Sequence, residues 1–272
     1  MLRLFLLCLA APAFCVADGA KILIVTDLEG VGGVNNADEQ LLPGQRRYEE
    51  SRRLLAGEVN AAVEGALSAG AAQVVIWDGH DGSRTLSIDQ IHPRATLIQG
   101  RPTPADYYLK RRLYDGILFV GQHAMVGANN GVLAHSQSFS VQRITLNGKP
   151  VGEIGQVAAI AGYFEIPVIM LAGDKAACDE MLALQPRAET VAVKQLAGKA
   201  STVSLSHVEA CGRIRQAAHA AVARIREFKP WTVDGPVELK FEFKPDEKQP
   251  SGRTVRYSGA NVLESFEDWL GK

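Results

Sequence analysis

The feature that most constrains the fold is a series of short apolar runs. They are separated by longer segments in which apolar residues have the spacing of a helix. The clearest runs are KILIVT at 21–26, VVIW at 74–77, GILFVG at 116–121 and VIMLAG at 168–173. Strands that are apolar on both faces are typical of a parallel sheet covered by helices on both sides. Apolar residues spaced three or four apart predict a long helix over 46–69. The sequence therefore predicts an α/β fold whose mainly parallel central sheet is flanked by helices on both faces.

The remaining elements follow the same alternation. Asn147-Gly148 is the favoured two-residue turn of a β-hairpin, and Asp174 is a typical helix cap. Further strands are expected at 95–98 and 191–195, and further helices at about 104–113, 153–164, 175–185 and 206–227.

The C-terminal part of the chain has a different pattern. In VELKFEF (237–243) apolar and charged residues alternate strictly, which predicts a strand with one buried and one exposed face, at a sheet edge or in an antiparallel pair. We expect residues 230–272 to form a smaller C-terminal α+β portion of a single domain spanning 18–272. The alternative is that 230–236 is only a loop.

The first residues have the pattern of a secretory signal peptide. Arg3 gives a short positive region, residues 4–11 are apolar, and small residues follow. The apolar run is too short to span a bilayer. We expect a signal peptide over 1–17, cleaved after Ala17, and a periplasmic or extracellular location after passage across the inner membrane. The alternatives are an additional buried strand or helix, or lipid attachment at Cys15.

The charge balance excludes several classes of partner. The chain has 29 basic and 30 acidic residues, so nothing in its net charge of −1 favours nucleic acid or, once the signal peptide is removed, a membrane surface. Cys178 and Cys211 remain after that removal, and an oxidising compartment would allow them to pair. Buried free thiols are the preferred interpretation, because Cys211 falls on the apolar face of the helix expected at 206–227.

Two acids follow the first strand in DLEG. Alternate residues of an extended chain share a face, so Asp27 and Glu29 project together from the carboxyl end of the strand. In an open α/β sheet this end is where ligands bind. Two adjacent carboxylates repel each other unless a positive group lies between them, and a metal ion would meet that need. The alternative is a surface turn in which both acids are solvated.

Other potential ligands follow the neighbouring strands. His80 follows the strand at 74–77, His123 follows the strand at 116–121, and Glu153 begins a helix. Together with Asp27 and Glu29 they give three carboxylates and two imidazoles, more than one tetrahedral zinc ion with an open position requires. The set suits two metal ions bridged by one carboxylate. Mixed nitrogen and oxygen ligands favour zinc, then manganese or iron.

These motifs, in this order, resemble the DppA-like D-aminopeptidase family of zinc metallopeptidases. The resemblance extends from about residue 21 to the C-terminus. It rests on TDLEG (26–30), WDGH (77–80), GQHA (121–124), GVLAHS (131–136) and GEIG (152–155), and IHP (91–93) and AGD (172–174) agree with it.

The resemblance implies a function and an assembly. Asp27, Glu29, His80, His123 and Glu153 would hold two zinc ions per subunit, and His135 would be the catalytic histidine. The family forms a homodecamer of two stacked pentamers and releases N-terminal residues, with D-alanine as the type substrate, from short peptides; some members take L-residues. This chain departs from the family pattern in GSRTL (82–86) and in an apparently shortened segment near 244–252. Both departures bear on substrate choice or assembly.

The roles of several polar residues remain open at this stage. His135 would shuttle a proton or stabilise an oxyanion; a direct nucleophile and a simple loop contact are the alternatives. Asp78 would either orient a histidine ligand or cap its own loop. His92, His207 and His219 are expected to make local contacts only.

Two other functions are compatible with parts of the pattern. An acid pair after a first strand also occurs in phosphatases that form an aspartyl-phosphate and in calcium-binding ribohydrolases. Glu29, His80 and His123 argue against the phosphatases, which use a second Asp and rarely a histidine. A secreted protein that binds peptides or metal without catalysis would not require His135.

Overall fold

The computed structural model of the chain describes residues 19–100, 109, 113–199 and 201–271. The signal peptide expected at 1–17 and almost all of the helix expected at 104–113 lie outside this part. Within the described residues, no helix combines the length and the apolar character needed to cross a membrane.

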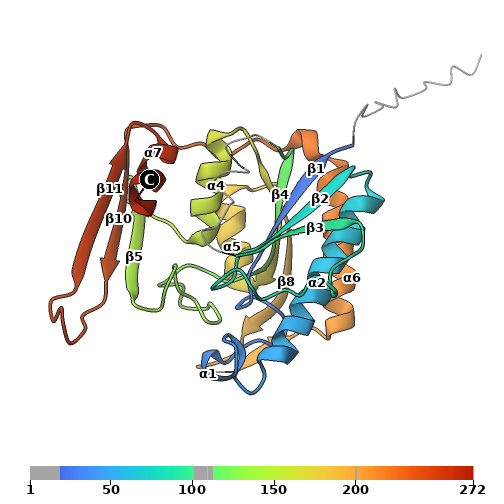
Figure 1. Ribbon diagram of the computed structural model, residues 1–272, viewed down its shortest axis with the longest axis horizontal. Helices are drawn as coiled ribbons and strands as arrows, with labels where there is room; N and C mark the ends of the chain where they lie inside the picture. The colour runs from blue at the N-terminus through green and yellow to red at the C-terminus, as the bar shows by residue number, and fades with distance from the viewer. Residues whose placement is uncertain (1–18, 101–108, 110–112, 200, 272) are drawn as a thin grey trace, which may run out of the picture.

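A seven-stranded sheet forms the centre of the molecule (Figure 1). Its strand order is β3-β2-β1-β4-β7-β8-β9, and every neighbouring pair is parallel except β8 and β9. The predicted mainly parallel sheet is therefore confirmed. The strands are β1 (Lys21–Thr26), β2 (Gln73–Asp78), β3 (Ala95–Ile98), β4 (Gly116–Gln122), β7 (Val168–Asp174), β8 (Glu189–Leu196) and β9 (Thr202–Ser204).

Helices cover both faces of this sheet, as expected (Figure 1). Alternate residues of β1 enter the two layers: Ile22 and Ile24 join the core beneath α2 and α6, whereas Leu23 and Val25 join the core beneath α4 and α5. This arrangement explains why four consecutive residues of the strand, 22–25, are apolar. The covering helices are α2 (Tyr48–Ser68), α4 (Glu153–Tyr163), α5 (Lys175–Leu184) and α6 (His207–Ala223), and shorter pieces are α1 (Ala37–Gln40) and the 3₁₀ turn η1 (Ile225–Glu227).

The strand register brings three loops to one edge of the sheet. Thr26, the last residue of β1, pairs with Asp78 in β2 and with Val120 in β4. Because these strands are parallel, the chain leaves all three of them in the same direction. The acid pair after β1 therefore meets the histidines that follow β2 and β4.

A second, four-stranded sheet has the order β11-β10-β5-β6 and carries α7 (Figure 1). The expected hairpin turn is present, with φ of 49° at Asn147 and 76° at Gly148. In β10 the predicted alternation is confirmed, since Val237, Leu239 and Phe241 are buried. The smaller α+β portion also contains β5 and β6, which come from the middle of the chain. Its elements are β5 (Val141–Leu146), β6 (Lys149–Pro150), β10 (Val237–Phe243), β11 (Arg253–Gly259) and α7 (Val262–Leu270).

Both cysteines of the described chain are free thiols. Cys178 lies on the buried face of α5, whereas Cys211 in α6 is only partly buried. The expectation of two free thiols is confirmed, but burial is complete only at Cys178.

Candidate metal centre

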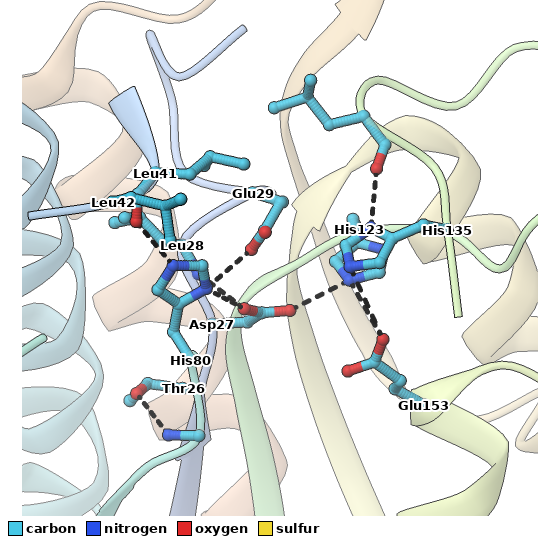
Figure 2. Close-up of polar contacts among 12 residues, drawn as sticks. Thr26, Asp27, Leu28, Glu29, Leu41, Leu42, His80, His123, His135 and Glu153 are labelled. Atoms are coloured by element: carbon cyan, nitrogen blue, oxygen red, sulfur yellow. Dashed lines mark hydrogen bonds and ion pairs between the residues drawn. The ribbon is translucent and has the colours of Figure 1, made fainter. Parts of the chain in front are cut away.

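Five predicted ligands converge at the carboxyl edge of the central sheet (Figure 2). Four of them are buried, and Glu153 is partly buried. We call this set the acid–imidazole cluster: Asp27, Glu29, His80, His123 and Glu153.

Asp27 lies at the middle of the cluster and contacts both imidazoles (Figure 2). Its Oδ1 lies 3.1 Å from Nδ1 of His80, and its Oδ2 lies 3.2 Å from Nε2 of His123. Glu29 adds a second carboxylate on the His80 side, with Oε2 3.0 Å from Nδ1 of that ring. One carboxylate thus connects two groups of potential ligands.

Glu153 completes the other side of the cluster. Its Oε1 lies 3.5 Å from Nε2 of His123 and 3.9 Å from Nε2 of His135. Glu153 is the first residue of α4, where the helix dipole favours a negative charge. The same oxygen accepts a 2.7 Å hydrogen bond from the backbone N–H of Gln137. The carboxylate is therefore fixed by its helix and by the loop that carries His135.

Glycines allow the first two ligand loops to approach each other. The backbone N–H of Asp27 donates to Val120 and that of Gly30 donates to Gly121, at 2.9 and 2.7 Å. A Cβ at Gly30 would lie 2.0 Å from the carbonyl oxygen of Gln122, and a Cβ at Gly121 would lie 2.0 Å from that of Asp27. Gly121 also has a φ of +80°, which disfavours other residues. The glycines of DLEG and GQH thus permit the contact that places Asp27 beside His123.

Each imidazole near the cluster donates one ring N–H to a backbone carbonyl. A carbonyl oxygen can only accept, so the ring nitrogen that faces it must carry the proton. The opposite nitrogen then has a free lone pair whenever the ring is neutral, and this is the usual arrangement of a metal-binding histidine. The pairs are His80 Nε2 with Leu41 at 2.9 Å, His123 Nδ1 with Ala124 at 3.0 Å and His135 Nδ1 with Leu133 at 2.9 Å.

Several buried atoms of the cluster lack a hydrogen bond. They are Oδ2 of Asp27, Oε2 of Glu29 and Nε2 of His123. Each has an oppositely charged neighbour within ion-pair distance, but not with the angles that a hydrogen bond requires. Buried polar atoms without a partner are rare in folded proteins, so these three fit a site that receives a metal ion.

Two groups of donor atoms in the described chain are compact enough to hold a metal ion. One joins Asp27 and Glu29 to His123, and the other joins His123 to His135 and Glu153; within each group all donor atoms lie within 4.8 Å of one another. His80 contacts the first group through Asp27 and Glu29. The geometry accordingly offers two adjacent positions for metal ions, with His123 close to both.

Charge in the metal-free cluster is shared between acids and rings. Burial disfavours the ionised form of Asp27, yet close contacts with the rings of His123 and His80 lower the pKa of this carboxyl well below its usual value. Burial likewise opposes the charge on His80, but Glu29 and Asp27 raise its pKa to about 12. The pKa of His123 is also raised, because Asp27 and Glu153 outweigh the effect of burial. The acids thus favour the charged form of both imidazoles, and the imidazoles favour the charged form of Asp27.

His135 lies beside the cluster in a column of three rings. Its ring stacks on that of His123, with centroids 4.0 Å apart and planes at 10°. On its other face it stacks on Phe139, at 4.3 Å and 23°. The residue is only 8% exposed.

Lys194, a buried residue of β8, lies next to the cluster and was not among the residues predicted for the site. Its Nζ donates to the backbone carbonyl oxygens of Glu29 and Val34. No described carboxylate forms an ion pair with it, and burial lowers its pKa to about 8 despite the nearby acids. In the sequence, the only indication of this buried lysine is its place directly after the apolar residues VAV in the predicted strand VAVKQ.

Two glutamates, the buried Glu58 and the partly buried Glu180, also support the ligand loops, and no periodic pattern in the sequence indicates either of them. Glu58 accepts a 3.0 Å hydrogen bond from the backbone N–H of Gly32, and burial raises its pKa to about 7. Glu180 accepts a 2.8 Å hydrogen bond from the N–H of Met125, two residues after His123.

The other polar candidates lie outside the cluster. Asp78 accepts a 2.8 Å hydrogen bond from the N–H of Leu86, so it caps its own loop and does not contact a cluster histidine. His92 accepts from the N–H of Arg94 at 3.1 Å and so stabilises a turn. His207 makes a local contact with Cys211 in α6. His219 hydrogen-bonds to Ser68 of α2, far away in the sequence, so the expectation of a purely local contact is wrong for His219.

A parallel sheet with a buried carboxylate–imidazole cluster at the carboxyl ends of its strands defines a metal-dependent hydrolase. More specifically, the chain belongs to the D-aminopeptidase family, whose sequence profile matches residues 20–264. The predicted family and enzyme class are confirmed.

Two known proteins show the extent of this similarity. The D-aminopeptidase of Bacillus subtilis (strain 168) is 31% identical over 265 residues, which cover 92% of this chain and 95% of the relative. The solved structure of the Zn-dependent D-aminopeptidase DppA from Bacillus subtilis, described as a self-compartmentalizing protease, superposes with a TM-score of 0.82. It is 28% identical, and the match covers 92% of this chain and 96% of that one. The family profile, at residues 20–264, spans the strands of both sheets and the loops that carry the five predicted ligands.

Proposed function

We propose that the protein is a secreted, zinc-dependent aminopeptidase that releases a D-alanine or a similarly small residue from the N-terminus of short peptides. The observation that carries the proposal is the position of Asp27, whose two oxygens face His80 on one side and His123 on the other. A carboxylate in this position suits a bridge between two metal ions.

The ligands divide between the two sides of Asp27. Glu29 and His80 would hold one zinc ion, and His123 and Glu153 the other. The mixed oxygen and nitrogen donors suit zinc, and manganese or iron would be accepted less readily. Bound in this way, two zinc ions supply an activated water and a polarised peptide carbonyl.

His135 would hold or move a proton at its Nε2 atom. Its Nδ1 donates to Leu133, so the acceptor nitrogen faces the cluster, 3.9 Å from Glu153. That nitrogen is also close enough to the second group of donors to be a ligand. We assign it to catalysis because the five other side chains already provide a shared carboxylate and two donors on each side.

The proposed function also includes a homo-oligomeric assembly and export from the cytoplasm. The description of DppA as self-compartmentalizing supports a homo-oligomer, and the family resemblance supports a decamer. The pattern of residues 1–17 supports export, which would place the enzyme where peptides of the cell wall are available.

Hydrolysis of defined dipeptides tests the proposal. Zinc-loaded protein is expected to cleave D-alanyl-D-alanine faster than L-alanyl-L-alanine, and to leave a generic phosphate ester intact. Treatment with a chelator should abolish the activity, and added zinc should restore it. Cleavage of the phosphate ester without cleavage of either dipeptide would reject the proposal in favour of another hydrolase class. Zinc binding without any hydrolysis would favour a binding protein.

A further inference from the structure

We propose that Phe139 is a positioning residue that holds the imidazole of His135 in its working orientation. The inference rests on the proposed function, because it takes His135 as the group that handles a proton. Phe139 itself is not assigned a contact with the reacting atoms.

The ring of Phe139 closes the one face of His135 that the cluster leaves open. On the opposite face His135 stacks on His123, and its Nδ1 is fixed by the carbonyl of Leu133. These two contacts alone would allow the imidazole to swing away from His123. With Phe139 stacked at 4.3 Å, the ring is held between two planes, and Nε2 stays directed toward Glu153.

The exposure of Phe139 indicates a role other than core packing. The residue is 46% exposed, so much of its apolar surface remains in water. Stacked aromatic pairs contribute stability beyond the area they bury, which makes a half-exposed ring effective as a support. The ring therefore contributes less to folding than a buried phenylalanine would, while it still restrains His135.

The loop that carries Phe139 is anchored through main-chain atoms. Lys244, which directly follows β10 in the second sheet, donates from Nζ to the carbonyl of Phe139 at 2.8 Å. Its backbone N–H donates to the carbonyl of Ser140 at 2.9 Å. At the other end of the loop, the N–H of Gln137 donates to Glu153. Truncation of the Phe139 side chain leaves all three anchors in place, so a variant tests the ring alone.

A series of substitutions separates ring stacking from apolar coverage. Phe139→Ala is expected to lower kcat by roughly ten- to a hundredfold, because small misplacements of a reacting group have effects of this size. KM and zinc content should stay close to those of the parent. Phe139→Tyr should restore kcat, since it keeps a planar ring. Phe139→Leu should not restore kcat, although it fills a similar volume.

Tyr163→Ala is the matched control. This aromatic residue is 42% exposed, at the far end of α4 from Glu153, and it pairs edge-on with Phe164. Its kcat and KM are expected to match those of the parent protein. A change in KM with an unchanged kcat in Phe139→Ala would make the ring a substrate contact and overturn the proposal.

A second measurement does not depend on activity. The rate at which diethyl pyrocarbonate acylates His135 in chelator-treated full-length protein can be followed by peptide mass spectrometry. The rate should rise in Phe139→Ala and stay near the parent value in Phe139→Tyr and Tyr163→Ala. An unchanged rate in Phe139→Ala would overturn the proposal. If the parent protein hydrolysed no peptide, the proposed function would fail, and the labelling rates would still decide whether Phe139 restrains His135.

Discussion

Nδ1 of His80 lies 3.1 Å from Oδ1 of Asp27, and the proton on the opposite nitrogen of the ring is fixed by the carbonyl of Leu41. The second oxygen of the same carboxylate faces His123. This relationship makes the two halves of the acid–imidazole cluster depend on one side chain.

Substitution of Asp27 should therefore remove both metal ions together. Asp27→Asn keeps the shape of the side chain but loses its charge and one acceptor oxygen. We expect zinc content, measured by plasma mass spectrometry after dialysis, to fall toward zero per subunit. The loss of affinity should exceed the roughly 10- to 100-fold that follows removal of a residue that only supports a ligand.

Asp78→Asn is the control for this variant, because Asp78 is also buried but hydrogen-bonds to Leu86. Its zinc content should stay at the parent level. Retention of one zinc ion per subunit in Asp27→Asn would show that the carboxylate does not serve both positions.

Removal of the imidazole at position 135 should separate catalysis from metal binding. We expect His135→Ala to keep its zinc and to lose about 10²- to 10⁴-fold in kcat, the usual contribution of a positioned acid or base. Parallel measurements of zinc content and of dipeptide hydrolysis check both parts. Normal turnover by the zinc-loaded variant would reject the catalytic role, and loss of zinc would instead make His135 a ligand.

Zinc binding should release protons. In the metal-free protein Glu29 and Asp27 raise the pKa of His80 to about 12, and Asp27 and Glu153 raise the pKa of His123 as well, so the acids favour the protonated form of both rings. A metal ion requires the neutral ring, and about two protons should therefore leave as both positions fill. The apparent affinity for zinc should accordingly rise with pH, because protons compete less well.

Calorimetric titration of the chelated protein in buffers of different ionisation enthalpy measures this release. The observed enthalpy should vary with the buffer, with a slope that gives the number of protons. An enthalpy independent of the buffer would contradict protonated rings in the metal-free cluster.

Lys194 should contribute to stability through the loop that carries Glu29. Lys194→Ala leaves the carbonyl oxygens of Glu29 and Val34 without their buried donor. We expect the free energy of unfolding of metal-free protein, measured in urea, to fall by about 2 to 3 kcal/mol. Lys175→Ala, which removes an exposed ion pair with Asp179, should change it by less than about 1 kcal/mol. Equal effects of the two variants would show that the loop does not depend on Lys194.

Much of the fold could be predicted because its signals are local. The apolar run of β1 and the turn Asn147-Gly148 each specify their own conformation within a few residues. Asp174 caps α5 as expected, through the N–H of Ala177. The partnership of β5 with β10 was not predictable in this way, because it joins segments about a hundred residues apart.

The cluster could be predicted for a related reason. The residues that follow parallel strands lie at one edge of the sheet. Once β1, β2 and β4 are predicted, the side chains after them can therefore be expected to lie together. Lys194 acts through a long-range contact with the carbonyl of Glu29, and Phe139 acts by stacking on His135, four residues earlier in an irregular loop. Such contacts leave no periodic pattern, and only the folded structure reveals them.

The most direct test of the central claim is an anomalous difference map at the zinc absorption edge, from crystals grown with zinc. We predict two peaks per subunit, about 3.5–4 Å apart, with Asp27 in contact with both. Glu29 and His80 should flank one peak, and His123 and Glu153 the other. A single peak, or none among these five side chains, would contradict the two-metal centre.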